Sequence, residues 1–204
     1  MKLNSMKLEQ YNLFPTISFS AVLDNYEEIN KRLIQKLETL DSEDYTEKLY
    51  GKQTSSIEYW PEAKPLVDAV NILIDKIQDH LGYVKDAKLE ASWIQIFDKV
   101  HRLEKHTHPN SWYSAAYYIQ AEPGSGTFNL SDPRPPAGIV HYPTVNYDNR
   151  DILEYMSFDV YPGLVIFFPS WVSHSVNETQ TNIKRMSAGF NWQKPYYTSM
   201  YTTV

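Results

Sequence analysis

The spacing of apolar residues changes near Lys88, and this change limits the folds that are open to the chain. Before this point apolar residues recur every three to four positions, as on the buried face of a helix. After it apolar and polar residues alternate, as in half-buried strands. The length of 204 residues suits one domain. We therefore expect a single domain over residues 1–204, with a helical support region at 1–87 and a β-sheet core at 88–204.

Two helices are predicted in the N-terminal region. The first begins after Asp24 and Asn25, with acidic residues in its first turn. The second begins near Pro65 and ends at Gly82, a residue type that is common just after a helix. Each helix carries an apolar stripe, so we expect both to pack on the core. The stripes consist of Ile29, Leu33, Ile34, Leu37 and Leu40, and of Leu66, Val67, Val70, Leu73, Ile74, Ile77 and Leu81.

Six strands are predicted after Lys88, separated by clusters of Gly, Pro, Asn and Asp. Short strands at this spacing are typical of a sandwich or barrel. The predicted fold class is α+β but mainly β, a barrel or jelly roll with the helices braced against one sheet. A proline-rich segment at 133–147 is long enough to form a lid or a binding loop. The six strands are Leu89–Phe97, Ser111–Ile119, Thr127–Leu130, Met156–Val160, Leu164–Phe168 and Ile183–Trp192.

The composition argues against several classes of function. The chain has 19 Lys and Arg against 25 Asp and Glu, and its net charge of −6 disfavours a general binder of duplex nucleic acid. The absence of cysteine excludes Fe–S clusters, zinc–thiolate sites and cysteine nucleophiles, and it fits a reducing cytoplasm. No stretch approaches the ~18 apolar residues of a membrane span. A metal site in this chain must therefore use His, Asp or Glu.

Three histidines form a candidate metal site. His106 and His108 are two residues apart, so in an extended strand both side chains point the same way. Pro109 favours extended geometry at His108. His174 follows a buried strand and a proline-containing turn, 68 residues after His106. Either element alone is more typical of solvated or turn histidines. Together they favour a three-histidine site for Fe(II), Zn(II), Cu(II) or Ni(II).

The last predicted strand has one apolar and one polar face. Its polar face carries Arg185, Ser187, Gly189 and Asn191. Arginine presents a planar fork that can bind a carboxylate through two hydrogen bonds. A solvent-facing side of the sheet is the alternative interpretation. With a metal site close by in the sequence, we favour a carboxylate-binding role for Arg185.

Taken in order, the motifs of this chain resemble those of the 2-oxoglutarate/Fe(II)-dependent oxygenases, and above all a group of them found in bacteria and tailed phages. The resemblance extends over nearly the whole chain. It includes Arg185, which lies eleven residues after His174. The motifs are Leu13-Phe14-Pro15-Thr16, His108-Pro109-Asn110-Ser111, Ser114-Ala115-Ala116-Tyr117-Tyr118-Ile119, Ser125-Gly126, Asp132-Pro133-Arg134, Phe168-Pro169-Ser170-Trp171-Val172-Ser173-His174, Arg185-Met186-Ser187 and Phe190-Asn191.

The resemblance implies a cupin-like double-stranded β-helix with N-terminal helices packed on its major sheet. It implies Fe(II) bound by His106, His108 and His174, and 2-oxoglutarate bound to that iron. The far carboxylate of 2-oxoglutarate would pair with Arg185, assisted by Ser187 and Tyr118. Tyr117 and Tyr118 face opposite sides of a strand, so only one can point inward. The implied reaction hydroxylates an unidentified substrate and releases succinate and CO₂.

One residue departs from the pattern of the broad superfamily, which has a carboxylate where this chain has His108. An imidazole there makes the metal site one unit more positive. A substitute acid could come from Asp132 or Glu104. Candidates for the substrate mouth are Trp112, Tyr113, Arg134, Tyr142, Tyr147, Trp171 and Asn191.

Two rival functions stay open. A metal cupin with three histidines could act without 2-oxoglutarate, and a phage or bacterial jelly roll could be a non-catalytic binding module. As an enzyme, the protein would act on a small molecule or a protein side chain. The tyrosine-rich segment at 196–201 would suit a homodimer.

Overall fold

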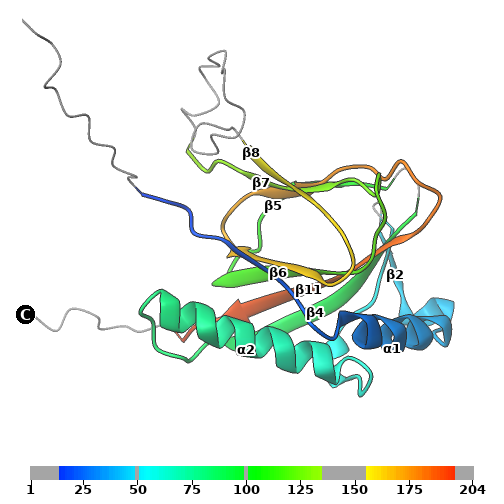
Figure 1. Cartoon of the computed structure of the whole chain (residues 1–204), viewed down its shortest axis with the longest axis horizontal. Coiled ribbons are helices and arrows are strands. Elements are labelled where there is room, and N and C mark those ends of the chain that lie inside the picture. The colour runs from blue at the N-terminus through cyan, green and yellow to red at the C-terminus, as the bar shows by residue number, and fades with distance from the viewer. Residues whose placement is uncertain (1–13, 49–50, 99–100, 135–154, 196–204) are drawn as a thin grey trace, which may run out of the picture.

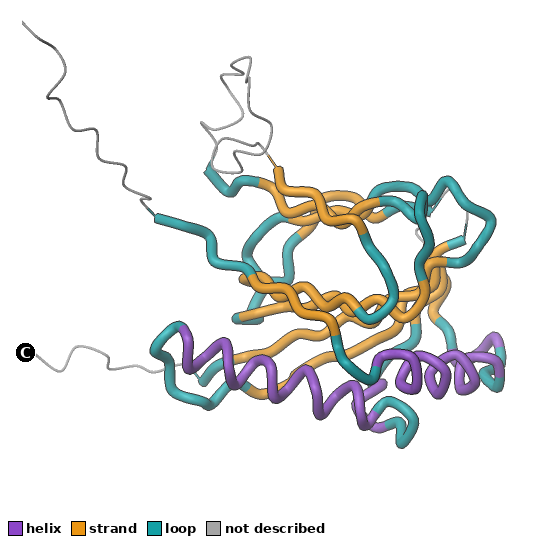
Figure 2. Tube along the Cα trace, viewed as in Figure 1, coloured by secondary structure: helices purple, strands orange, loops and turns teal. Residues whose placement is uncertain are grey.

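The computed structural model describes residues 14–48, 51–98, 101–134 and 155–195. They form two facing antiparallel sheets, with two helices on the outer side of the larger sheet (Figures 1 and 2). The predicted fold class, a mainly β jelly roll with helices packed on one sheet, is confirmed. Within the described ranges no helix has the length and apolar character needed to cross a membrane. The division into 1–87 and 88–204 within one domain stays a prediction.

The larger sheet has the strand order β1-β9-β6-β11-β4-β3-β2, and the smaller sheet has the order β5-β10-β7-β8. The strands of the larger sheet are β1 (Phe19–Val22), β2 (Thr46–Lys48), β3 (Gly51–Gln53), β4 (Lys88–Phe97), β6 (Tyr113–Gln120), β9 (Leu164–Pro169) and β11 (Arg185–Gln193). The strands of the smaller sheet are β5 (Leu103–His106), β7 (Thr127–Ser131), β8 (Tyr155–Asp159) and β10 (His174–Val176).

The six predicted strands correspond to β4, β6, β7, β8, β9 and β11. Five strands of three or four residues were not predicted, and three of them (β1, β2 and β3) precede residue 88 and join the larger sheet. Such short strands do not contain enough residues to display an alternating pattern. Two of them, β1 and β2, form the edges of the larger sheet.

Helices α1 (Tyr26–Glu38) and α2 (Lys64–His80) bury their predicted apolar stripes against the larger sheet. Two short 3₁₀ helices, η1 (Ser42–Asp44) and η2 (Ile57–Tyr59), lie between them in the chain. Each α-helix is also joined to the sheet by a hydrogen bond. The Tyr117 hydroxyl donates to Asn30 Oδ1 on α1 at 2.7 Å, and Trp192 Nε1 donates to Asn71 Oδ1 on α2 at 2.9 Å.

Alternation along β6 and β11 separates two cores. Tyr117, Phe190 and Trp192 point outward into the core shared with the helices. Tyr118 points into a second core between the two sheets, where it is buried with Phe128 and other apolar residues of both sheets. Because side chains of a strand alternate, the polar face of β11 also points between the sheets.

Candidate active site

The smaller sheet brings the three predicted histidines together. His106 ends β5 and lies directly opposite His174, the first residue of β10. His108 follows β5 by two residues, and its Nε2 lies 3.2 Å from His106 Nε2. One ligand nitrogen from each of the three histidines lies within 4.8 Å of the others. Among the described residues this group contains no carboxylate.

The two acids considered as substitutes have other partners. Asp132 accepts hydrogen bonds from the backbone and side chain of Arg134. Glu104 forms an exposed ion pair with Arg102 at 2.7 Å. The candidate site of the described chain is therefore built from imidazoles.

Backbone carbonyls orient two of the histidines. His106 Nδ1 lies 2.9 Å from the Glu104 carbonyl oxygen, and His174 Nδ1 lies 3.1 Å from that of Val172. A carbonyl oxygen can only accept, so each Nδ1 carries the proton and donates it. Each Nε2 is then left with a lone pair that can bind a metal.

His108 is oriented by side chains instead. Its Nδ1 lies 2.6 Å from Asn191 Oδ1 on β11, and the same oxygen accepts a hydrogen bond from the Ser114 hydroxyl at 2.8 Å. The Ser114 hydroxyl in turn contacts the Ser170 hydroxyl at 2.8 Å. The backbone of His108 donates to the Ser170 carbonyl oxygen at 2.9 Å. His108 is thus held at both its ring and its backbone.

Burial keeps His108 and His174 in the neutral form that binds metals. His174 is 3 % exposed. Its burial, and then repulsion from His106, lower its pKa from the ordinary 6.5 to about 3. Burial also lowers the pKa of His108. The loss of hydration disfavours the charged imidazolium, so these two ligands carry no proton on Nε2 near neutral pH.

Arg185 lies at the start of β11 and is completely buried. Its Nη1 donates to the carbonyl oxygens of Ser125 and Asn177, and its guanidinium lies 4.4 Å from the centre of the Phe97 ring. Its Nε and Nη2 are buried and have no hydrogen-bond partner among the described residues. Buried donors are rarely left unpaired, and a buried cation is costly without a counter-charge. The arrangement suits an anion with two acceptor oxygens.

Gly126 forms part of the wall around this arginine. Its φ is +83°, a conformation that favours glycine. A Cβ there would overlap the Asn177 carbonyl oxygen and lie 2.9 Å from Arg185 Nη1. The Ser125-Gly126 motif therefore has two roles, because Ser125 supplies an acceptor and Gly126 leaves room for the guanidinium.

Tyr118 and Ser187, both predicted to assist Arg185, are register partners on β6 and β11. Tyr118 is buried and close enough to Arg185 for their charges to interact. Burial raises the pKa of the Tyr118 hydroxyl, so it stays protonated and can donate a hydrogen bond. Ser187 shares the inner face of β11 with Arg185. The structure therefore brings the three predicted carboxylate-binding residues to one region between the sheets.

A cavity of about 840 Å³ opens beside the histidines. His106, His108 and Asn191 line it, together with Trp93 of β4. The Trp93 ring lies 5.6 Å from the His108 ring, centre to centre. The amide side chains of Gln53 and Gln95 complete its polar lining on the larger sheet.

Trp93 and Gln95 were missed as site residues. They alternate with Ile94 and Ile96 in the predicted strand Leu89–Phe97. This pattern shows which residues share a face of the strand. It does not show which face points toward the histidines, because that depends on which face the helices cover.

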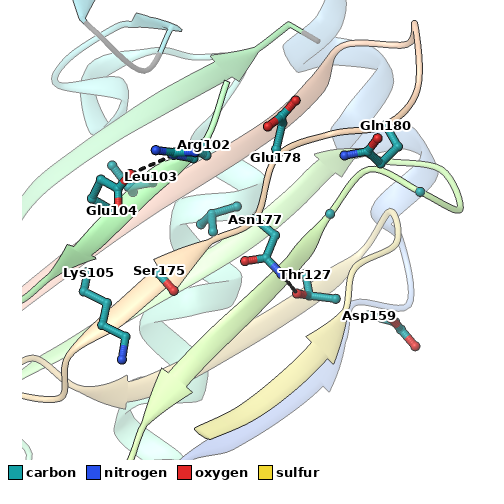
Figure 3. Close-up of a pocket in the computed structure, with 13 residues that line it drawn as sticks. Arg102, Leu103, Glu104, Lys105, Thr127, Asp159, Ser175, Asn177, Glu178 and Gln180 are labelled. Carbon is teal, nitrogen blue, oxygen red and sulfur yellow. Dashed lines mark hydrogen bonds and ion pairs between the residues drawn. The ribbon is translucent and has the colours of Figure 1, made fainter. Parts of the chain in front are cut away.

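A second hollow, of about 860 Å³, lies on the opposite side of the smaller sheet. Figure 3 shows its polar lining, in which Asn177 donates to Thr127 at 2.9 Å. Lys105 of β5 and Ser175 of the neighbouring strand β10 also belong to this lining. Residues 102–105 line both cavities, so β5 separates the two. None of the three histidines lines this hollow.

Two predicted mouth residues lie elsewhere. Trp112 packs edge-on against Tyr83 at 5.7 Å, and the Lys194 ammonium lies 4.9 Å from the Trp112 ring. Tyr113 points to the helix side of the sheet, where its hydroxyl donates to the Ile17 carbonyl oxygen at 2.8 Å. Neither residue lines the histidine cavity.

Trp171 and Arg134 are also separate from the cavity lining. Trp171 is exposed in the turn between β9 and β10. Arg134 is exposed and paired with Asp132 at 2.5 Å. Tyr142 and Tyr147 lie outside the described residues. Of the predicted mouth residues, Asn191 is the one that the described structure brings to the cavity.

Comparison with solved structures shows the same fold. A prolyl-4-hydroxylase from Pseudomonas putida is 14% identical to this chain, with a TM-score of 0.62. The match covers 89% of this chain and 94% of the hydroxylase chain. HygX from Streptomyces hygroscopicus, solved with nickel and 2-oxoglutarate, is 13% identical with a TM-score of 0.61, covering 90% and 85%. A 2OG-Fe(II) oxygenase family oxidoreductase from Burkholderia pseudomallei is 13% identical with a TM-score of 0.59, covering 86% and 84%. No curated protein matches the chain.

The sequence itself matches a family model over residues 91–191, and that family is described as "Putative 2OG-Fe(II) oxygenase". The matched region contains the three histidines, Arg185 and Asn191. Of these residues, His106, His108 and Asn191 line the cavity. The predicted resemblance to the 2-oxoglutarate/Fe(II)-dependent oxygenases is therefore confirmed, and residues 91–191 of this chain belong to the 2OG-Fe(II) oxygenase family.

Proposed function

We propose that this protein hydroxylates an unidentified substrate in a reaction that depends on Fe(II) and 2-oxoglutarate and releases succinate and CO₂. The observation that carries the proposal is the buried guanidinium of Arg185, whose Nε and Nη2 have no partner among the described residues. It shares the inner face of β11 with Asn191, which contacts the candidate ligand His108. A dicarboxylate bound at one end to a metal and at the other to Arg185 would satisfy both groups.

His106, His108 and His174 would hold the Fe(II). Metal–imidazole bonds of about 2.0–2.1 Å place the nitrogens of two ligands roughly 3 Å apart when they bind side by side. The 3.2 Å between the Nε2 atoms of His106 and His108 supports this assignment. Three neutral ligands leave coordination positions open, and they leave the full positive charge of the ion at the site.

Arg185 would bind the far carboxylate of 2-oxoglutarate through its two unpaired donors, with hydrogen bonds from Tyr118 and Ser187. When bound, Fe(II) and 2-oxoglutarate would activate O₂, so that one oxygen atom enters the substrate and the other enters succinate. The chain itself would orient the cosubstrate through Arg185. The apolar core around Tyr118 would keep water from the buried end of the site.

The substrate would occupy the cavity of about 840 Å³, where we propose contact with Asn191 and Trp93. A small molecule or a protein side chain would suit this position. We place the activity in the cytoplasm of a bacterial or phage-infected cell, on the family resemblance and the cysteine-free composition. A homodimer stays a prediction.

The test is anaerobic mixing of the metal-free protein with Fe(II) and 2-oxoglutarate, followed by visible spectroscopy. We expect the weak metal-to-ligand charge-transfer band of a chelated 2-oxo acid. The band should vanish in His174→Ala, and Arg185→Ala should need far more 2-oxoglutarate to produce it. Arg32→Ala is the matched control, because Arg32 is an exposed arginine of α1 paired with Glu28.

Two outcomes would contradict the proposal. Metal binding without the band would favour a three-histidine cupin that acts without 2-oxoglutarate. Failure to bind Fe(II) through His106 and His174 would favour a non-catalytic binding module.

A further inference from the structure

We propose that Asn191 is a positioning residue that selects the metal-binding tautomer of His108. The inference rests on the proposed function, because it takes the three histidines as metal ligands. It goes beyond that function by assigning a role to the hydrogen-bond chain behind His108. This chain consists of Asn191, Ser114 and Ser170.

His108 differs from the other two histidines in the acceptor that it uses. His106 and His174 donate to carbonyl oxygens two residues before them, which belong to the backbone and cannot rotate as a side-chain amide can. His108 Nδ1 contacts the side-chain oxygen of Asn191, 83 residues away. A side-chain amide can rotate to present either its oxygen or its NH₂ group. The tautomer of His108 therefore depends on how this amide is held.

In the structure the amide presents its oxygen to both His108 and Ser114. The Ser114 hydroxyl has one hydrogen, which it donates to Asn191 Oδ1. It must then accept a hydrogen bond from the Ser170 hydroxyl, 2.8 Å away. Ser114 is 1 % exposed and Ser170 is fully buried, so water does not compete for these groups. The hydrogen bonds thus run in one direction, from Ser170 through Ser114 to Asn191 Oδ1.

The opposite amide orientation would block the ligand. Asn191 Nδ2 would then donate to His108 Nδ1, and the imidazole proton would move to Nε2. A protonated Nε2 has no lone pair for a metal. With Oδ1 toward His108, the proton stays on Nδ1 and Nε2 is free. The orientation in the structure, with Oδ1 toward His108, is therefore the one that a metal site requires.

The amide also sets the charge of the site. His108 stands where the broad superfamily has a carboxylate, and its acceptor is neutral. Carboxylate acceptors behind ligand histidines increase the basicity of the ring and its affinity for metal. Asn191→Asp would therefore keep the acceptor and add the negative charge that this ligand set lacks.

The first experiment examines the metal-free protein by ¹⁵N NMR of the imidazole rings, with the His108 signals assigned by their loss in His108→Gln. We expect the wild type and Asn191→Asp to carry the His108 proton on Nδ1. Asn191→Leu, which lacks an acceptor at similar volume, should shift the tautomer toward Nε2. A wild-type His108 protonated on Nε2 would overturn the inference without any variant.

The second experiment measures Ni(II) affinity by calorimetry. We expect Asn191→Leu to weaken binding by about 10–100-fold and Asn191→Asp to bind at least as tightly as the wild type. Asn71→Leu is the matched control, since it removes a hydrogen bond to Trp192 on the opposite face of the same strand. Its affinity should stay close to that of the wild type, because the substitution touches neither a metal ligand nor the acceptor of one.

An affinity in Asn191→Leu equal to that of the control would overturn the inference. If the wild type binds no Ni(II) or Fe(II), the proposed function fails instead, and the NMR tautomer alone decides the role of Asn191. The two failures are thus distinguishable.

Discussion

Gly189 and Trp93 show how a single residue shapes the cavity. They are opposite each other on β11 and β4. A Cβ at Gly189 would overlap Cε2 and Cζ2 of the Trp93 indole. The indole therefore lies over the bare backbone of β11, beside His108. Here glycine is needed because of close packing and not because of a turn.

Gly189→Ala is expected to destabilise the protein by about 1–3 kcal/mol, because the added methyl group must displace the indole. Trp93→Ala removes the obstacle. The double variant should therefore lose less stability than the sum of the single variants, as measured by urea denaturation. Additive losses would contradict this packing.

His174 predicts a pH dependence of the metal-free protein. Burial, and then repulsion from His106, lower its pKa to about 3 when folded, against 6.5 as the ordinary value. Between these values the unfolded chain binds a proton that the folded chain does not. The free energy of unfolding therefore falls as the pH falls through this window.

Urea denaturation in the presence of a chelator, at about pH 7.5 and about pH 5, measures this effect. The wild type should lose more stability than His174→Gln between the two pH values. His80→Gln, at an exposed histidine of α2, should behave as the wild type. Equal losses in all three proteins would show that His174 does not cause the pH dependence.

At the scale of elements, the two helices support the sheet that carries Asn191 and Arg185. Their apolar stripes share one core with the outer faces of β6, β11 and β4. The hydrogen bonds to Asn30 and Asn71 fix where each helix lies along the sheet. Loss of this packing would remove the support of the strands whose inner faces line the site.

Two isoleucines of α2 test this contribution with the same chemical change. Ile74 is 1 % exposed and Ile72 is 58 % exposed. Ile74→Ala is expected to lower the free energy of unfolding by about 2–5 kcal/mol, through lost burial and the cavity it leaves. Ile72→Ala should change it by about 0.5 kcal/mol or less. Similar effects in urea denaturation would contradict the orientation of the helix.

At the scale of the whole molecule, the candidate site joins the two sheets. His106 and His174 belong to the smaller sheet, while Asn191, Trp93 and Arg185 belong to the larger one. A bound metal would hold β5, β10 and the segment at His108 together. Its binding free energy would then add to the stability of the folded state.

Ni(II) at 100 times its Kd should stabilise the protein by about 2.7 kcal/mol, which corresponds to a rise in Tm of roughly 5–10 °C for a chain of this size. Thermal denaturation with and without a chelator measures the shift. His174→Gln should show little or no shift. An equal rise in this variant would mean that the metal binds elsewhere.

Much of the architecture followed from local patterns. The change of period near Lys88 predicted both helices and the six longer strands, because these elements are long enough to display their spacing. The pair His106 and His108 was recognisable because residues two apart share a face of an extended segment. Arg185 was a candidate because its strand alternates clearly between polar and apolar residues.

Where the sequence offered two equivalent residues for a place in the site, the tertiary structure decided which of them lies there. Alternation separates Tyr117 from Tyr118, but α1 covers one face of β6 and thereby turns Tyr118 toward Arg185. In the same way it is Trp93, and not Trp112, that lies beside His108. The sequence by itself determined the longer elements and the types of candidate ligand, because spacing and chemistry are local properties. The meeting of β5 with β10, the orientation of each imidazole and the buried state of Arg185 depend on contacts between distant segments, which only the folded chain brings together.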